Sequence, residues 1–457
     1  MSNPPPEARP AETYAEVEDA LLSRWPESRL DPTLERIEDF TDLLGRPQDA
    51  YPAIHLTGTN GKTSTARMVE ALLLALGLRT GRFTSPHLES MTERISIDGE
   101  PLDVEAFVRA FNDIAPYTHL VDAQHDHPLS FFETIVGMAY AAFADAPVDV
   151  AVVEVGMGGA WDATNVIDAK VAVLTPVAVD HIQYLGDTPG EIAREKVGII
   201  KPGATVVTAV QTPEVAQVLV ERCTAVGATI AREGLEFGVR TRVPAVGGQL
   251  LSLQGLRGQY DEVFLPLFGL HQAQNAALAL AAVEAFIGGE DPLAEEAVKE
   301  AFGQVTSPGR LEVVRRSPTI VLDAAHNPHG AAAVVEALED SFAFSPLIGV
   351  VGVMADKDYE GLLAALEPVF AHVVCTRNST ARAMPAHELA EVARGIFGQD
   401  RVGETPSLID AIDQASTLAE AGGVFGEGLG SGGVLVTGSV ITVGEARALL
   451  LRHGAGS

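Results

Sequence analysis

Short runs of β-branched and apolar residues alternate with stretches of helical periodicity between residues 53 and 210. The apolar runs lie at 53–57, 148–156, 169–177 and 204–210. Between them, apolar residues recur three and four positions apart, which predicts helices over 62–76 and 189–200. This alternation is typical of βαβ units, so the pattern predicts an α/β fold with a mainly parallel sheet.

The pattern changes twice further along the chain. Residues 237–268 alternate apolar positions with glycines, which predicts a small antiparallel meander, and a helix follows over 271–287. A second βα series then begins near residue 310. Its apolar runs lie at 319–325, 347–354, 372–377 and 432–439. A further, smaller Rossmann-like α/β domain is therefore expected.

The length of the chain supports this division. A chain of 457 residues is too long for one core. We expect a disordered, Pro-rich lead-in over 1–20, a larger domain over 21–305 and a smaller one over 306–457. The boundary is placed where Pro308 and Gly309 interrupt the helical pattern.

Charge and cysteine content exclude several classes of protein. The formal net charge is −31, and such an acidic surface repels nucleic-acid backbones and anionic lipid. The sequence also contains no apolar run long enough for a membrane-spanning helix. The two cysteines are far apart and lack metal or redox spacing, which fits a reducing cytoplasm. We therefore expect a cytoplasmic protein without nucleic-acid or membrane partners.

The segment "TGTNGKTS" lies between the first apolar run and the first predicted helix. A glycine-rich turn before a helix offers backbone N–H groups to phosphate oxygens. Lys62 can reach terminal phosphates, and Thr63 or Ser64 can offer a hydroxyl to Mg²⁺. In the usual spacing the first glycine would occupy position 56, where Leu56 stands, and here the glycine is Gly58. The alternative is an ordinary strand–helix turn.

Glu154 ends the second apolar run, in "VVEVGMGGAWDATNV". A carboxylate at the end of a buried strand is costly unless it is paired, so Glu154 is a candidate metal ligand. The alternative is a carboxylate at a solvated sheet edge. Asp162 and Asn165 can cap the next turn.

Two cationic candidates follow in "DHIQYLGDTPGEIAREKVGIIKPG". His181 comes after a predicted strand, where a lone histidine is usually a satisfied loop residue. Lys196 lies at helical spacing from Ile192, Ile199 and Ile200. If it is buried there, its amine is driven toward the neutral, reactive form, whereas the alternative is an ordinary solvated lysine.

The second βα series carries "LDAAHNPHG", with Asp323, His326 and Asn327 between a strand and a helix. Ligands bind at such sheet ends, although Asn327 can equally be a helix cap. Arg310 lies at the predicted domain boundary and can reach a phosphate with its planar guanidinium.

Together these segments resemble a known family. The motifs occur in the order "TGTNGKTS", "TSPHLESMTERISIDG", "EVGMGGAWDATNV", "DHIQYLG", "IAREKVGIIKPG", "HQAQNA", "PGRLE", "DAAHNP", "GVMADKD" and "VLVTGSVITVGEAR". From about Leu30 onward, the chain resembles folylpolyglutamate synthase/dihydrofolate synthase of the Mur ligase superfamily. Leu56 is normal for the phosphate loop of that superfamily, and Gly58 is its matching glycine.

The resemblance implies a P-loop ATPase domain followed by a Rossmann-like glutamate-ligase domain, with ATP bound between them. It implies two Mg²⁺ ions, with Ser85 and Glu154 as ligands of the first and His181 of the second. It also implies carbamylation of Lys196 and a folate pterin near Phe132, Asp162 and Ala163. The implied ATP contacts are Gly58, Thr59, Asn60, Gly61, Lys62, Thr63, Ser64, Asn275, Arg310, Asp323 and His326.

The implied reaction joins L-glutamate to dihydropteroate or to a reduced folate through an acyl phosphate, with Lys62, Glu154, His181 and Lys196 as the catalytic group. The resemblance also implies a monomer. Ala160 departs from the family, which usually has arginine there.

Two alternatives remain open. One is a cell-wall Mur-type amino-acid ligase. The other is a non-catalytic ATP-binding regulator, which would bind ATP without turnover.

Overall fold

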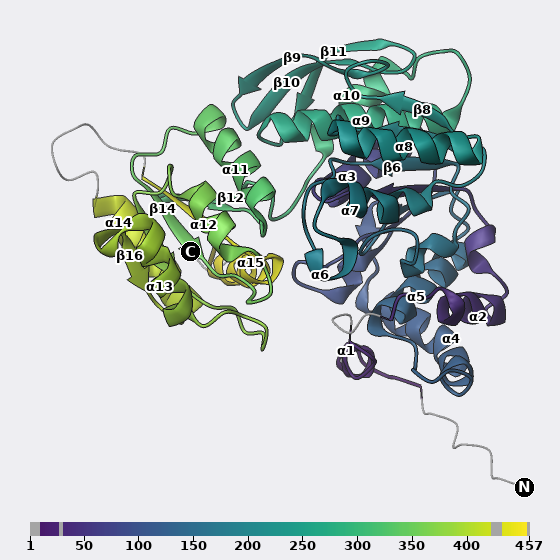
Figure 1. The fold of residues 1–457 in the computed structure, drawn as a ribbon, viewed down its shortest axis with the longest axis horizontal. Helices are drawn as coiled ribbons and strands as arrows, with labels where there is room; N and C mark the ends of the chain where they lie inside the picture. Colours follow the sequence, from purple (N-terminus) through teal and green to yellow (C-terminus); the bar gives the residue numbers. More distant parts are fainter. Residues whose placement is uncertain (1–9, 27–30, 422–431, 455–457) are drawn as a thin grey trace, which may run out of the picture. The chain divides into compact units, whose positions relative to one another are not determined.

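The computed structural model describes residues 10–26, 31–421 and 432–454. Their contacts divide the chain into two compact units (Figure 1). The first comprises the chain up to Arg240 together with Ser252–Val263 and Gln274–Gln304. The second comprises Thr241–Leu251, Phe264–Ala273 and the chain from Val305 onward. Two stretches within the predicted domain 21–305 therefore group with the second unit, and Arg242 on one of them pairs with Asp340.

The first unit is built on a sheet with the strand order β4-β3-β2-β5-β1-β6-β7-β8. Its strands are β1 (Ala53–Thr57), β2 (Thr80–Phe83), β3 (Ile95–Ile97), β4 (Glu100–Pro101), β5 (Val150–Glu154), β6 (Val171–Leu174), β7 (Thr205–Thr208) and β8 (Thr229–Arg232). Pairing is parallel from β2 to β8 and antiparallel only at β2–β3 and β3–β4. The prediction of a mainly parallel sheet is confirmed.

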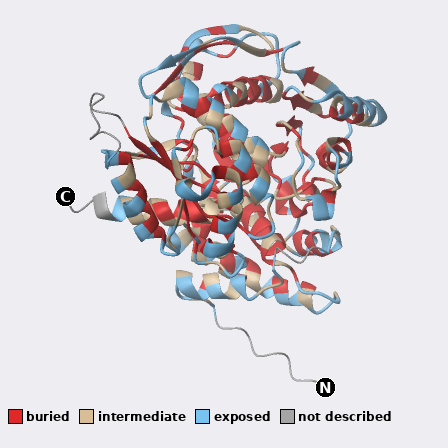
Figure 2. Cartoon of the chain, turned by 60° about the vertical axis from the view of Figure 1, so that its left-hand side comes forward, coloured by how far each residue is buried: buried red, intermediate tan, exposed pale blue. Residues whose placement is uncertain are grey.

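Several helices of this unit connect consecutive strands, whereas α1, α2 and η1 precede β1. The helices are α1 (Tyr14–Leu22), α2 (Glu35–Leu43), η1 (Pro47–Asp49), α3 (Lys62–Ala75), η2 (Met91–Arg94), α4 (Val104–Asp122), α5 (Phe131–Asp145), η3 (Ala163–Val166), α6 (Ile182–Leu185), α7 (Pro189–Lys196), η4 (Val197–Ile199), α8 (Pro213–Val226), α9 (Leu270–Ile287) and α10 (Glu295–Gln304). The central strands β1 and β5 are buried along their whole length. Continuous burial is expected for parallel strands covered on both faces. In Figure 2, buried residues are red, and several helices carry both buried and exposed residues.

Helix α1 corrects the prediction of a disordered lead-in over 1–20. The hydroxyl of Thr13 accepts a hydrogen bond from the backbone of Glu16, and the Glu16 carboxylate caps Thr13 in return. Val17 and Leu21 are buried in the core of the unit. This capping box and apolar face stabilise a helix despite the Pro-rich residues before it. The predicted lead-in over 1–9 lies outside the described residues.

The predicted meander is also present. Strands β9 (Gly238–Ala245), β10 (Gly248–Gln254) and β11 (Gln259–Leu265) form a separate sheet in the order β11-β10-β9. The predicted helix 271–287 corresponds to α9.

The second unit has its own sheet, in the order β12-β13-β17-β14-β15-β16. Its strands are β12 (Glu312–Arg316), β13 (Thr319–Leu322), β14 (Leu347–Val351), β15 (His372–Cys375), β16 (Val402–Glu404) and β17 (Gly433–Thr437). Its helices are α11 (Pro328–Ser341), α12 (Tyr359–Leu366), α13 (Ala386–Phe397), η5 (Gln399–Arg401), α14 (Leu408–Ala421) and α15 (Val440–Gly454). All pairings except β12–β13 are parallel, as a Rossmann-like domain requires. Within the described part of the chain, no helix is long and apolar enough to cross a membrane.

Candidate functional site

The loop 58–64 joins the buried strand β1 to the N-terminus of α3, and two of its glycines are sterically required. Gly58 has φ 143° and Gly61 has φ 88°. A Cβ at Gly58 would lie 1.9 Å from Thr175 Oγ1, and one at Gly61 would lie 2.7 Å from Asn275 Oδ1. At these two positions no side chain covers the backbone at the N-terminus of α3. Its N–H groups can therefore be approached closely by phosphate oxygens. The loop also brings Asn275, on α9, against Gly61.

Two lysines converge on the same backbone oxygen of this loop. Lys62 Nζ donates to the carbonyl oxygens of Gly58 at 3.2 Å and Thr59 at 3.3 Å. Lys196 Nζ, at the end of α7, donates to Gly58 O at 2.8 Å. Neither lysine forms a salt bridge with another described residue. Both amines are thus held at the phosphate loop by neutral backbone groups.

Lys196 is buried, with only 4% of its surface exposed, which is the first of the two possibilities that its apolar spacing left open. This burial, reinforced by repulsion from Lys62, lowers the pKa of Lys196 to about 7. An amine with this pKa is substantially neutral near neutral pH, whereas an ordinary lysine is not.

Glu154 lies at the end of β5 and is buried. Its carboxylate accepts hydrogen bonds from Thr63 Oγ1 at 2.9 Å and from the backbone N–H of Ser85, which follows β2, at 3.4 Å. One carboxylate and two hydroxyl residues are thus brought together beside the phosphate loop. This donor set fits Mg²⁺, which typically takes one or two carboxylates and completes its shell with phosphate oxygens and water. Among the described residues there is no cluster of three or more His, Cys, Asp or Glu side chains suited to a metal ion.

The loop carrying His181 is fastened to the phosphate loop through Thr59. The Thr59 N–H donates to Pro176 O at 2.9 Å. Its hydroxyl donates to Ala178 O at 2.9 Å and accepts from Ala178 N at 3.0 Å. His181 then adopts φ 54°, and its Nε2 lies 3.9 Å from Asp180 Oδ2. The side chain of Thr59 therefore bonds to the His181 loop.

The glycine-rich segment after β5 packs against the end of α7. A Cβ at Gly159 would lie 2.8 Å from the carbonyl oxygens of both Glu195 and Lys196. Asp162 is buried and accepts hydrogen bonds from Met157 N at 2.9 Å and Thr164 N at 3.0 Å. Burial raises its pKa. Asp162 thus shapes this turn, whose next residue, Ala163, begins η3.

Phe132, on α5, reaches the same turn from the other side. A Cβ at Gly156 would lie 2.5 Å from its ring, and the ring centroid is 5.9 Å from that of Phe83 on β2. An aromatic face is therefore present next to the Glu154 strand end.

Ala160, at the position where the family usually has arginine, is held by its main chain. Its N–H donates to Glu195 O at 2.9 Å, and its carbonyl oxygen accepts from Asn165 Nδ2 at 3.0 Å. The side chain is partly exposed and takes part in neither bond.

The remaining predicted residues lie in the second unit, at the carboxyl end of β13. Asp323 is buried and accepts from Leu311 N at 2.9 Å and Ala325 N at 2.8 Å. Burial raises its pKa, and the nearby Arg310 acts in the opposite direction. His326 Nδ1 lies 3.0 Å from Ala324 O. Asn327 accepts from Gly330 N at 2.8 Å and is the N-cap of α11, so the capping interpretation of this residue is confirmed.

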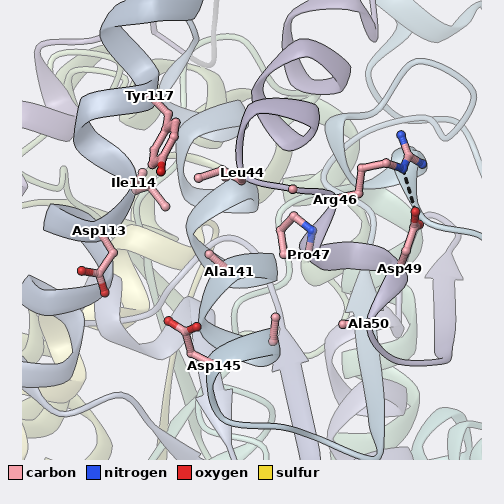
Figure 3. Close-up of a pocket in the computed structure, with 12 residues that line it drawn as sticks. Leu44, Arg46, Pro47, Asp49, Ala50, Asp113, Ile114, Tyr117, Ala141 and Asp145 are labelled. Carbon is pink, nitrogen blue, oxygen red and sulfur yellow. Dashed lines mark hydrogen bonds and ion pairs between the residues drawn. The ribbon is translucent and has the colours of Figure 1, made fainter.

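An open cleft of about 550 Å³ lies elsewhere in the first unit, among η1, α4 and α5 (Figure 3). It borders the residues just before β1, whereas the phosphate loop follows the end of that strand. Arg46 at its rim pairs with Asp49 at 2.7 Å. None of the site residues predicted from the sequence lines it.

The sequence analysis did not identify the residues that pack against the site residues and position them. Thr175 fills the space beside Gly58, and its hydroxyl donates to Thr57 O at 3.3 Å. Thr164 lies between Asp162 and His55, whose Nε2 is 2.9 Å from Thr164 Oγ1. His55 is buried in β1, and burial lowers its pKa to about 3. The sequence did contain a signal for this contact. His55 stands inside an apolar strand, and a buried imidazole ring needs a hydrogen-bond partner.

Comparison with known proteins places these features in a family. The family model of the Mur ligase middle domain matches residues 56–283, and that of the Mur ligase glutamate ligase domain matches residues 309–440. A Mycobacterium tuberculosis protein named dihydrofolate synthase/folylpolyglutamate synthase is 51% identical over 96% of this chain and 94% of its own length. A Bacillus subtilis protein of the same name is 34% identical over 75% of this chain and 80% of its own length.

Solved structures agree. Mycobacterium tuberculosis folylpolyglutamate synthase complexed with ADP superposes with a TM-score of 0.92 at 51% identity, covering 96% of this chain and 98% of that one. Escherichia coli FolC in complex with DHPP and ADP superposes with a TM-score of 0.84 at 29% identity, covering 98% and 99%. The resemblance inferred from the motifs is confirmed, and the chain belongs to the folylpolyglutamate synthase/dihydrofolate synthase family of Mur ligases.

Proposed function

We propose that this chain is an ATP-dependent ligase that joins L-glutamate to dihydropteroate and to reduced folates. The single observation that carries the proposal is the convergence of Lys62, Lys196 and the Thr63–Glu154 pair on the phosphate loop. The names of the relatives supply the substrates. ADP is bound in the matched Mycobacterium tuberculosis structure, and ADP with DHPP in the Escherichia coli one.

The loop residues Gly58 to Ser64 would hold the ATP phosphates through their N–H groups, and Lys62 would turn from the Gly58 and Thr59 carbonyl oxygens to the terminal phosphates. Asn275 would contact the nucleotide beside Gly61. In the second unit, Asp323 would bind the ribose, with Arg310 and His326 as further contacts. Phe132 and the Asp162–Ala163 turn would receive the pterin.

We assign Ser85 and Glu154 to a first Mg²⁺ and His181 to a second. Bound there, the ions would supply neutralisation of the phosphate charge. The chain's own part is to orient the carboxylate of Glu154 through Thr63 and to hold the His181 loop through Thr59.

The low pKa of Lys196 supports its carbamylation. Its neutral amine attacks the carbon of CO₂, a C–N bond forms, and one proton is released. The product is a carbamate anion, which replaces the positive charge next to Lys62 and stands within reach of the His181 loop.

The reaction has two steps. A carboxylate oxygen of the acceptor attacks the γ-phosphorus of ATP, the bond from that phosphorus to the β–γ bridging oxygen breaks, and ADP leaves with the electron pair. The amine of L-glutamate then attacks the carbonyl carbon of the acyl phosphate and inorganic phosphate leaves, while the amine loses a proton. Lys62 stabilises the charge that builds up on the transferred phosphoryl group.

We further propose that the protein is a cytoplasmic monomer, on the basis of the family resemblance. Light scattering coupled to gel filtration tests the oligomeric state.

The function is tested by phosphate release with ATP, Mg²⁺ and L-glutamate, using dihydropteroate, tetrahydrofolate or no acceptor, with mass spectrometry of the products. We expect a glutamate-sized mass increase on both acceptors. An increase on one acceptor assigns a single activity. ATP binding without any adduct would contradict the proposal and favour a regulator.

A further inference from the structure

One arginine beside the site has no role in the reaction described above. Arg67 lies on α3, and helical geometry places Thr63, Arg67 and Glu70 on the same face. Thr63 bonds to Glu154 at the end of β5, and Glu70 bonds to Arg82 of β2 at 2.6 Å. Arg67 therefore projects from α3 over the ends of β2 and β5, between these two contacts.

Arg67 is partly buried, yet it forms no hydrogen bond or ion pair with any residue in the described ranges. The carboxylates that act on it electrostatically are Glu70, Glu93 and Glu154. Each of them already accepts hydrogen bonds from other groups. Glu70 accepts from Arg82, Glu93 from the backbone N–H groups of residues 88–90, and Glu154 from Thr63 and Ser85.

The guanidinium of Arg67 is therefore not hydrogen-bonded to Glu70, Glu93 or Glu154, although these carboxylates act on it electrostatically. Burial, with repulsion from Arg82 as the next cause, lowers the pKa of Arg67 to about 10, which still leaves the guanidinium charged at neutral pH. Withdrawing an arginine from water without a matching anion is costly, and buried charges are normally paired. A ligand anion would meet this requirement.

The position of Arg67 indicates which anion. It lies four residues beyond Thr63, about 6 Å farther along the α3 axis, and so away from the N–H groups that face the phosphates. The β2–β5 flank it overlooks also carries Ser85 and, through Gly156 and Phe83, the ring of Phe132. This is the side assigned to the acceptor.

We infer that Arg67 binds the α-carboxylate of a glutamate-bearing acceptor, the carboxylate that does not react. This inference rests on the proposed function. A folate acceptor carries an α- and a γ-carboxylate, and only the γ-carboxylate is phosphorylated. Dihydropteroate carries only the carboxylate that reacts. Arg67 is then a specificity-determining residue that serves folate acceptors and not dihydropteroate.

The test is the Arg67→Met variant of the full-length protein, assayed at saturating ATP and glutamate with each acceptor. The KM for tetrahydrofolate should rise about 10- to 100-fold, the usual effect of losing a charge-assisted, two-pronged contact. The KM values for dihydropteroate and ATP should change by less than about threefold. Arg67→Lys should recover part of the tetrahydrofolate affinity, because the charge is kept and the planar fork is lost.

Arg79→Met is the matched control. Arg79 precedes β2 in the same unit, is half-exposed and pairs with Asp98 at 3.0 Å, so its loss should leave both acceptors unaffected. Direct calorimetric titration of the ADP-bound protein with tetrahydrofolate gives a readout independent of turnover. It also serves if Arg67→Met is unstable, because Arg67→Lys can then be compared with the unchanged protein.

Equal KM changes for both acceptors, or a change confined to ATP, would overturn the inference. So would a loss of thermal stability with unchanged acceptor KM values, which would make Arg67 structural. If the unchanged protein turns over neither acceptor, the proposed function itself fails, and that outcome is distinct from a failure of the inference.

Discussion

The first unit contains two groups of buried charges that are held in opposite ways. In the network of α3 and β2, Arg82 is matched by the carboxylate of Glu70, and its other nitrogens donate to Thr84 and Ser96. In the phosphate loop, the hydrogen bonds that Lys62 and Lys196 donate to described residues all go to backbone carbonyl oxygens. Arg82 is therefore paired with an opposite charge, whereas the two lysines are bonded to the dipoles of peptide carbonyl groups.

The difference separates structure from function. A saturated ion pair offers nothing to a ligand, and its loss is felt as instability. A cation bonded only to neutral groups can still attract a ligand anion, so its removal is expected to lower activity. We expect mutations to divide along this line.

The largest effect is expected for Lys62→Met. Removing the charge that faces the transferred phosphoryl group should lower kcat/KM by about 10³-fold, with the thermal midpoint nearly unchanged. Steady-state phosphate release and thermal melting check both. Lys170→Met, at an exposed position, is the control. A stability loss as large as that of a core ion pair would break the comparison.

Arg82→Met should show the reverse pattern. It leaves the buried Glu70 without its cation, which should cost about 3–5 kcal/mol of unfolding free energy in urea denaturation. The KM values for ATP and acceptor should stay within about twofold at temperatures where the variant is folded. The exposed Arg79→Met should cost less than about 1 kcal/mol. An Arg82→Met protein of normal stability would contradict the structural role of this network.

The pH dependence sharpens the comparison through Lys196. Its neutral form is needed for carbamylation and its pKa is about 7, so activity at limiting bicarbonate should fall as pH drops below 7. For stability the sign is opposite to that of a lysine in a salt bridge, whose pKa is raised by folding. Between about pH 7 and 10.5 the unfolded state binds the extra proton, so Lys196 makes stability rise with pH in this window. Denaturation of the unchanged protein and Lys196→Met across pH 6–10 tests this slope, and identical slopes would refute it.

A smaller effect is expected at Thr59. Thr59→Val keeps the shape but removes both hydrogen bonds to Ala178, which should loosen the His181 loop and raise the Mg²⁺ concentration for half-maximal activity about tenfold. Thr59→Ser should restore the normal requirement. A change in ATP affinity alone, without a shift in the Mg²⁺ requirement, would place the Thr59 hydroxyl at the nucleotide instead.

The smallest effect is expected for Ala160→Arg. The position is partly exposed and is fixed by main-chain bonds to Glu195 and Asn165, so the change should alter kcat/KM by less than about threefold for either acceptor. A gain of tenfold or more would show that the family arginine is missed here.

The sequence was a good guide wherever a residue's role follows from its own strand or helix. β1 and α3 begin where periodicity predicts, whereas the isoleucine spacing around Lys196 left its burial open. Helix α1 was missed although Thr13 and Glu16 carry the capping-box spacing, because the Pro-rich composition dominated the interpretation. The bonds from Thr59 to the His181 loop and the environment of Arg67 could not be predicted from sequence. They depend on Ala178, Glu154 and Arg82, which are brought near only by the folded sheet.

The carbonyl oxygen of Gly58 has a consequence beyond the phosphate loop. It is the acceptor shared by Lys62 and Lys196, so the two amines repel each other across a single atom. A carbamate on Lys196 would replace that repulsion with attraction, and by thermodynamic reciprocity a nucleotide that repositions Lys62 would alter CO₂ uptake equally. Under the proposed function, the nucleotide and the carbamate therefore influence each other's binding through Lys62.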